Sequence, residues 1–180
     1  MKARPPADGT LVSVDGASAV AVMRAARLAS AGRGKRAGIS RWDASGIFGD
    51  LDAAGPEIER PSARTLLLLY AADLAFRLRW EIRPALAEGR RVVAAPYVDT
   101  AIALGRAAGV DESWLRSLFL FAAVPAERRY VDAGPVTASG QGFVEFSCRR
   151  LVGMEAPSAR QDLVTRTRAR LKTTRHRSRT

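Results

Sequence analysis

Residues 10–28, TLVSVDGASAVAVMRAARL, restrict most strongly what this chain can fold into. Their apolar residues run up to the dipeptide Asp15-Gly16, a pattern typical of a buried strand that ends in a tight turn. From about Ser18 the apolar positions take the spacing of a helix. We therefore predict a strand–turn–helix unit. The free backbone N–H groups and the dipole at the start of such a helix favour a bound anion.

This unit lacks the side chains of a phosphate-binding loop. The pattern G-x-x-x-x-G-K-[ST] uses two glycines to wrap the phosphates, a lysine for the outer phosphates and a hydroxyl for magnesium. Aligned with the turn, its four defined positions are Ser13, Ser18, Ala19 and Val20. None of the four carries the required residue. The context for phosphate binding is therefore present without its reactive groups.

Predicted strands and helices alternate along the rest of the chain. We expect strands at residues 39–42, 91–95 and 129–131, and helices at residues 63–88, 97–108, 112–123 and 159–172. Ser62 and Asp111 are expected to cap two of these helices, and Pro84 to bend or restart the first. Residues 143–152 suit either helix or strand. This alternation predicts an α/β fold, with helices on both faces of a parallel sheet.

The helix predicted at residues 63–88 is the clearest in the sequence. Its apolar residues are expected to form a buried stripe, beside a charged face that carries Asp73, Arg77 and Glu81. Gly89 is expected to end it.

Length and composition favour one domain. The chain has 180 residues, of which 47% are hydrophobic, so it can bury a core of its own. We expect a flexible arm at residues 1–9, an α/β domain at 10–164 and a basic tail at 165–180. The single Cys148 excludes an internal disulfide, and no apolar run is long enough to cross a bilayer. We therefore expect a cytoplasmic protein with no membrane contact. With His176 as the lone histidine, we expect no metal site.

The net charge of +11 is concentrated near the carboxyl end of the chain. The last fifteen residues contain seven basic side chains and no acidic one: Arg166, Arg168, Arg170, Lys172, Arg175, Arg177 and Arg179. Such a run can hold RNA, DNA or an acidic partner through salt-sensitive contacts. A solvated, disordered end is the favoured alternative, because no aromatic residue interleaves the run for base stacking.

Residues 66–103, LLLLYAADLAFRLRWEIRPALAEGRRVVAAPYVDTAIA, carry a family resemblance. The order and spacing of residues 67–73, of residues 82–86 with the following Gly89, and of residues 97–99 resemble the middle of bacterial thymidylate kinase, a P-loop nucleoside monophosphate kinase. The Asp15-Gly16 turn and Arg41 fit the same family. The resemblance extends over roughly residues 10–123. It implies a three-layer α/β/α P-loop NTPase-like fold with a parallel sheet, truncated relative to the family.

The departures from this family concern the groups that carry its chemistry. Ala19 and Val20 replace the loop lysine and hydroxyl, Ala95 and Pro96 replace the Asp-Arg pair of the D-R-Y motif, and Leu74 replaces an arginine. Phosphoryl transfer depends on positioning and on electrostatic stabilisation, and the loss of one such group costs about 2.7–4 kcal/mol. We therefore predict no catalytic residues, no phosphotransferase activity and no cofactor. ATP and magnesium are expected only if the chain is an active kinase after all.

The same resemblance leaves a candidate residual nucleotide pocket. Its residues are Asp15, Gly16, Ser18, Arg41, Tyr70, Tyr97 and Asp99. The resemblance places the ring of Tyr70 where it would stack on a base. The alternative is that Tyr70 is a core aromatic residue and that Asp15 only satisfies backbone N–H groups of its turn. Nucleotide binding is expected to be weak at most.

Three functions remain open at this point. The first is a pseudokinase of the thymidylate kinase type that acts as an interaction or regulatory module, either as a homodimer through apolar positions of residues 63–86 or with another protein. The second is an active nucleoside monophosphate (dTMP) kinase with atypical catalytic residues. The third is a protein associated with nucleic acid or ribonucleoprotein that binds through the basic tail.

Overall fold

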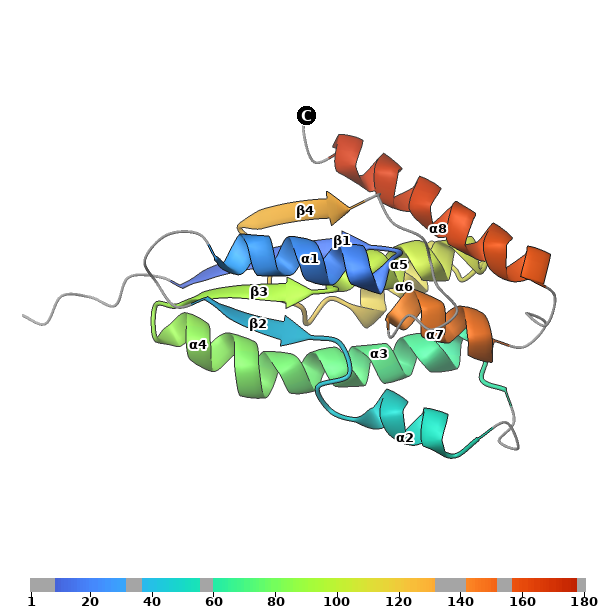
Figure 1. The fold of residues 1–180 in the computed structure, drawn as a ribbon, viewed down its shortest axis with the longest axis horizontal. Helices are drawn as coiled ribbons and strands as arrows, with labels where there is room; N and C mark the ends of the chain where they lie inside the picture. Colours follow the sequence, from blue (N-terminus) through green and yellow to red (C-terminus); the bar gives the residue numbers. More distant parts are fainter. Residues whose placement is uncertain (1–8, 32–36, 56–59, 132–141, 152–156, 178–180) are drawn as a thin grey trace, which may run out of the picture.

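A parallel sheet forms the centre of the molecule (Figure 1). The computed structural model describes residues 9–31, 37–55, 60–131, 142–151 and 157–177. In these residues the strands are β1 (Thr10–Gly16), β2 (Gly38–Arg41), β3 (Arg91–Ala95) and β4 (Glu127–Val131). They lie in the order β2-β3-β1-β4, and all neighbours are parallel. The predicted parallel sheet is thus confirmed.

Helices lie on both faces of this sheet. They are α1 (Ala19–Ser30), α2 (Ile47–Ala53), α3 (Ala63–Arg77), the π-helical segment η1 (Leu78–Ile82), α4 (Arg83–Ala87), α5 (Val98–Ala107), α6 (Glu112–Leu118), α7 (Phe143–Arg150) and α8 (Pro157–Arg177). Helix α1 covers one face, whereas α3, α4 and α5 lie on the other (Figure 1). The arrangement has the three layers expected from the sequence.

The side chains of β1 point alternately to its two faces and belong to two different apolar clusters. Val12 and Val14 face α1, where they pack with Val22 and its neighbours. Leu11 belongs to the other and larger cluster, which α3, α5, α7 and α8 complete. Because residues of a strand point alternately to its two faces, one short strand supplies both cores.

Three helices begin at a side-chain cap, and the two predicted caps, Ser62 and Asp111, are among them. Ser18 accepts a hydrogen bond from the backbone N–H of Ala21 at 3.5 Å and begins α1. Ser62 and Asp111 do the same for α3 and α6, at 3.1 Å and 2.9 Å. A side-chain oxygen at this position satisfies a backbone donor that the helix leaves without a partner.

Pro84 is accommodated without interrupting the long helix. The chain continues from α3 through η1 into α4, and the backbone N–H of Arg83 bonds to the carbonyl of Leu78, five residues earlier. Proline lacks an N–H, and a wider π-helical turn lets the helix pass it. Gly89, with a φ of 72°, follows the end of the helix as predicted.

Several predicted boundaries are corrected by the structure. Residues 143–150 are helical, which resolves the ambiguity there. Helix α6 ends at Leu118 rather than Ala123. The final helix reaches Arg177, so that much of the expected basic tail is helical, because Thr167 and Leu171 are buried on its inner side. Residues 1–8, most of the expected arm, lie outside the described residues.

Candidate functional site

A cleft of about 920 Å³ opens at the carboxyl ends of β1, β2 and β3. Gly16, Arg41 and Pro96 line it from the strand ends, Ala19 from α1 and Glu145 from α7. β1 lies between β3 and β4, so the strand order reverses at this point. Parallel α/β proteins bind their ligands at such a position. This cleft is therefore the candidate site.

The connection from β1 to α1 is short and tightly packed. β1 ends at Gly16 and α1 begins at Ala19, which leaves only two residues between them. A Cβ atom on Gly16 would lie 2.7 Å from the Val131 side chain. The backbone N–H of Gly16 donates a hydrogen bond to Thr100 Oγ1 at 3.1 Å. The glycine is thus needed for close approach of the backbone.

An internal carboxylate lies at the first turn of α1. Glu145 Oε1 accepts a hydrogen bond from the backbone N–H of Ala19 at 2.8 Å, and Glu145 is buried. The start of α7 is equally close, because a Cβ atom on Gly142 would lie 2.6 Å from that of Ala19. The position where a helix start favours an anion therefore holds a side chain of the protein itself.

Tyr70 is buried against the same helix α7. Its ring centroid lies 4.4 Å from that of Phe143, and its hydroxyl donates to the carbonyl of Tyr97 at 2.8 Å. Burial raises the pKa of Tyr70 above its usual range. Tyr97, also buried, donates its hydroxyl to the carbonyl of Ala123 at 2.8 Å, and burial raises its pKa to about 12. Phe143 thus contacts the aromatic residue that the family resemblance places where a base would stack.

Asp15 is fully buried and caps the start of α5. Its Oδ1 accepts from the backbone N–H groups of Tyr97 and Thr100, at 2.9 Å and 3.0 Å, and from Thr100 Oγ1 at 2.8 Å. Burial, and then the charge of Asp99, raise the pKa of Asp15 to about 7. Asp99 itself accepts hydrogen bonds from Arg128 and from the hydroxyl of Tyr130.

A third carboxylate caps a helix at this edge of the sheet. Asp43, which follows β2 with a φ of 61°, accepts from the N–H groups of Phe48 and Gly49, each at 2.9 Å. Aspartate tolerates such a left-handed backbone better than most residues. The helices α1, α2 and α5, which follow three of the strands, therefore all begin on carboxylates of the chain.

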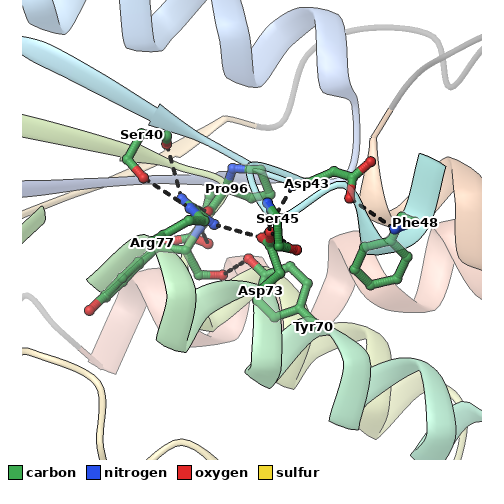
Figure 2. A network of polar contacts seen from close by, with 10 residues as sticks. Ser40, Asp43, Ser45, Phe48, Tyr70, Asp73, Arg77 and Pro96 are labelled. Atoms are coloured by element: carbon green, nitrogen blue, oxygen red, sulfur yellow. Dashed lines mark hydrogen bonds and ion pairs between the residues drawn. The ribbon is translucent and has the colours of Figure 1, made fainter. Parts of the chain in front are cut away.

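Asp73 and Arg77 do not lie on a charged helix face, as the sequence suggested, but are fully buried. Figure 2 shows the polar contacts that they make. They form an ion pair at 3.9 Å. Arg77 donates to the carbonyls of Ser40 and Pro96 and to Ser40 Oγ, each at 3.0 Å. Asp73 accepts from the N–H groups of Asp43 and Ser45 and from Ser45 Oγ. The pair thereby joins α3 to the ends of β2 and β3.

Sequence reasoning missed this pair as a unit, although a signal was available. Asp73 and Arg77 are four residues apart, and they continue the spacing of the buried Leu66 and Tyr70 along one side of α3. An acidic and a basic residue on an apolar stripe indicate a buried pair.

The other predicted site positions are dispersed. Arg41 is exposed and lines the cleft, Val20 is exposed at its rim, and Ala95 lies buried at the end of β3. Leu74 is buried in the core. The basic residues Arg166, Arg168, Arg170 and Lys172 lie on α8, whereas Arg179 and the side chains of Arg175 and Arg177 fall outside the described residues.

The described ranges contain neither a metal-binding cluster nor a membrane-spanning helix. No three histidine, cysteine, aspartate or glutamate residues there come together closely enough to hold a metal ion. None of the helices described combines the length and the apolar character that crossing a membrane requires.

The strand order, the three layers and the cleft define a P-loop NTPase-like α/β/α fold. Its structural similarity is to thymidylate kinase: the crystal structure of the enzyme from Ehrlichia chaffeensis matches with a TM-score of 0.66, over 94% of this chain and 88% of that one. The sequences are 13% identical, so the similarity is one of fold. The predicted thymidylate kinase-like fold is confirmed. No family model and no curated protein matches the sequence.

Proposed function

We propose that the chain is a thymidylate kinase-like protein that does not transfer phosphate and acts as an interaction or regulatory module. The observation that carries this proposal is the hydrogen bond from Ala19 N–H to the Glu145 carboxylate. It occupies a backbone donor that a phosphate would need. A phosphate group at this place would meet a buried negative charge.

The residues at the start of α1 do not fit ATP with magnesium. A phosphate loop needs enough main chain to wrap the phosphates, a lysine and a metal-binding hydroxyl. Here only two residues separate β1 from α1, and the helix opens with Ala19 and Val20. No step of phosphoryl transfer can be assigned to these groups.

The residues expected around a nucleoside monophosphate also favour a non-catalytic role. Phe143 packs on Tyr70, and Leu74 is in the core rather than in the cleft. Arg41 is the member of the predicted pocket that is exposed and lines the cleft. Arg24 and Arg27 of α1 also line the cleft and are exposed. Exposed guanidinium groups would hold a monophosphate weakly, because solvent screens their charge.

The surface that supports an interaction role runs along α3 and η1. Leu68, Phe76 and Trp80 follow one another at multiples of four residues and are exposed at 53%, 39% and 62%. Such spacing places them on one side of a helix, where an apolar stripe indicates a partner. We propose a second copy of this chain as that partner, since the resemblance implies homodimers through these helices.

An activity assay tests the catalytic half of the proposal. The purified chain would be incubated with ATP–Mg and, in turn, dTMP and the other nucleoside monophosphates, and diphosphate formation would be followed by chromatography. No turnover above the uncatalysed rate is expected. Sustained turnover that disappears on Arg41→Ala would overturn the proposal and favour the active kinase with atypical residues.

A mass measurement in solution tests the interaction half. Light scattering after gel filtration should give a dimer for the wild-type chain and a monomer for a Phe76→Ser/Trp80→Ser variant. The matched control is Leu28→Ser on α1, which removes an apolar side chain that is 70% exposed on another surface. A monomeric wild-type chain, or a dimer that survives the double change, would contradict a dimer through α3.

A further inference from the structure

A basic groove runs between α8 and the segment where α5 ends and α6 begins. Two clefts, of about 750 Å³ and 390 Å³, share Arg106, Arg170 and Thr173 and so form one depression. Arg166 lines the first cleft, and Arg116 lines the second. Residues far apart in the sequence thus place four guanidinium groups along one groove.

These charges are only partly neutralised within the groove. Glu112 accepts hydrogen bonds from both Arg106 and Arg116, the latter at 3.2 Å. Among the residues that the structure describes, no other acidic side chain lines either cleft. Arg166 and Arg170 lie one helical turn apart on α8, and both are exposed. The groove therefore carries an excess of positive charge that can attract an anion.

The groove is fixed by the fold rather than by a flexible tail. Helix α8 packs against α5 (Figure 1). On the inner side of α8, Leu163, Thr167 and Leu171 are buried. Arg166 and Arg170 therefore project from a helix whose opposite side is anchored. Preorganised side chains lose less entropy when they bind a ligand than side chains on a disordered segment do.

We propose that this groove binds the phosphodiester backbone of a nucleic acid. Arginine matches phosphate geometry with two parallel hydrogen bonds, and a row of such residues suits a ligand with regularly repeated negative charges. None of the described residues that line the two clefts is aromatic, so these residues offer no ring for bases to stack on. The contacts are thus with phosphates and are independent of sequence. This site is separate from the cleft at Gly16.

Fluorescence anisotropy with labelled oligonucleotides, single- and double-stranded, tests the site on the full chain. Between about 50 and 200 mM salt the affinity should fall steeply. Arg166→Ala/Arg170→Ala should weaken binding at least tenfold. It should also reduce the slope of log K against log salt by about 1.4 to 1.8, because each of the two lost phosphate contacts contributes about 0.7 to 0.9. Arg166→Lys/Arg170→Lys should retain most of the slope.

The matched control is Arg168→Ala/Lys172→Ala, which removes the same charge from the same helix outside the groove lining. Circular dichroism would establish that each variant keeps its helices. Equal losses in the two double variants would overturn the proposal, because binding would then follow net charge alone. The proposal would also be overturned if no oligonucleotide bound. If polyglutamate bound as tightly and lost affinity on Arg166→Ala/Arg170→Ala, the partner would be an acidic protein instead.

Discussion

The Glu145 carboxylate lies 2.8 Å from the backbone nitrogen of Ala19, across 126 positions of the chain. This hydrogen bond joins α7 to the first turn of α1, at the edge of the sheet where the strands end. Phe143 lies on the same helix as Glu145, two residues earlier, and packs on Tyr70 of α3. Helix α7 thus supplies both an aromatic ring and a negative charge to the cleft.

Removal of the Glu145 side chain should destabilise the protein. Glu145→Ala leaves the N–H of Ala19 without its partner, and we expect the free energy of unfolding to fall by about 1–3 kcal/mol. Glu145→Gln retains an acceptor oxygen and should lose less. Urea denaturation followed by circular dichroism measures both. If α1 then accepts an anion, inorganic phosphate should stabilise Glu145→Ala but not the wild-type chain. A loss as large for Gln as for Ala would indicate that the charge matters more than the bond.

Asp15 should make stability depend on pH. Its pKa is about 7 in the folded protein, above the ordinary value of 3.8. The folded state therefore binds a proton that the unfolded state has released between these values, and stability should fall as pH rises from about 4 to 7. Asp15→Asn keeps an acceptor for Thr100 and abolishes this titration.

The measurement is the difference in unfolding free energy between the wild-type chain and Asp15→Asn at several pH values. The wild-type chain should lose stability relative to the variant as pH rises through this window. Carboxylates that do not interact with Asp15 contribute equally to both proteins, so they cancel. Parallel curves would show that Asp15 titrates normally.

The pair Asp73 and Arg77 should show strong coupling. Either single change, Asp73→Asn or Arg77→Met, leaves part of a buried network without its counterpart and should cost about 3–5 kcal/mol. The double variant should lose clearly less than the sum, because it leaves no isolated charge. A double-mutant cycle by urea denaturation measures the difference. Additive losses would mean that their hydrogen bonds to other groups outweigh the ion pair.

Cys148 should be unreactive in the folded protein. It is 4% exposed, and burial raises its pKa to about 11, so little thiolate exists at pH 8. Ellman's reagent should therefore react slowly under native conditions and rapidly in 6 M urea. Cys148→Ala provides the blank. Rapid native reaction would reveal local opening around α7.

Local signals in the sequence predicted much of the fold. The strand–turn–helix at residues 10–28, the caps Ser62 and Asp111 and the alternation of elements depend on neighbouring residues, and the structure confirms each. Pro84 was expected to bend or restart the helix, but a π-helical turn passes it. That outcome depends on how the flanking residues pack.

The contents of the cleft could not be predicted from the same signals. The carboxylate of Glu145 reaches Ala19 only because the fold brings α7 beside α1, and residues 143–152 did not even indicate their own secondary structure. Asp15 was interpreted as a turn residue or a ligand contact. The structure shows that its carboxylate caps α5, 82 positions away at Tyr97.

The carboxylates at the starts of α1, α2 and α5 have a consequence for how this protein persists in a cell. A protein that needs a bound metabolite to satisfy its helix ends gains stability by mass action and loses it when that metabolite is scarce. Here the satisfying groups are covalently attached, so their local concentration is constant. The capping of these three helix starts is therefore independent of any bound metabolite.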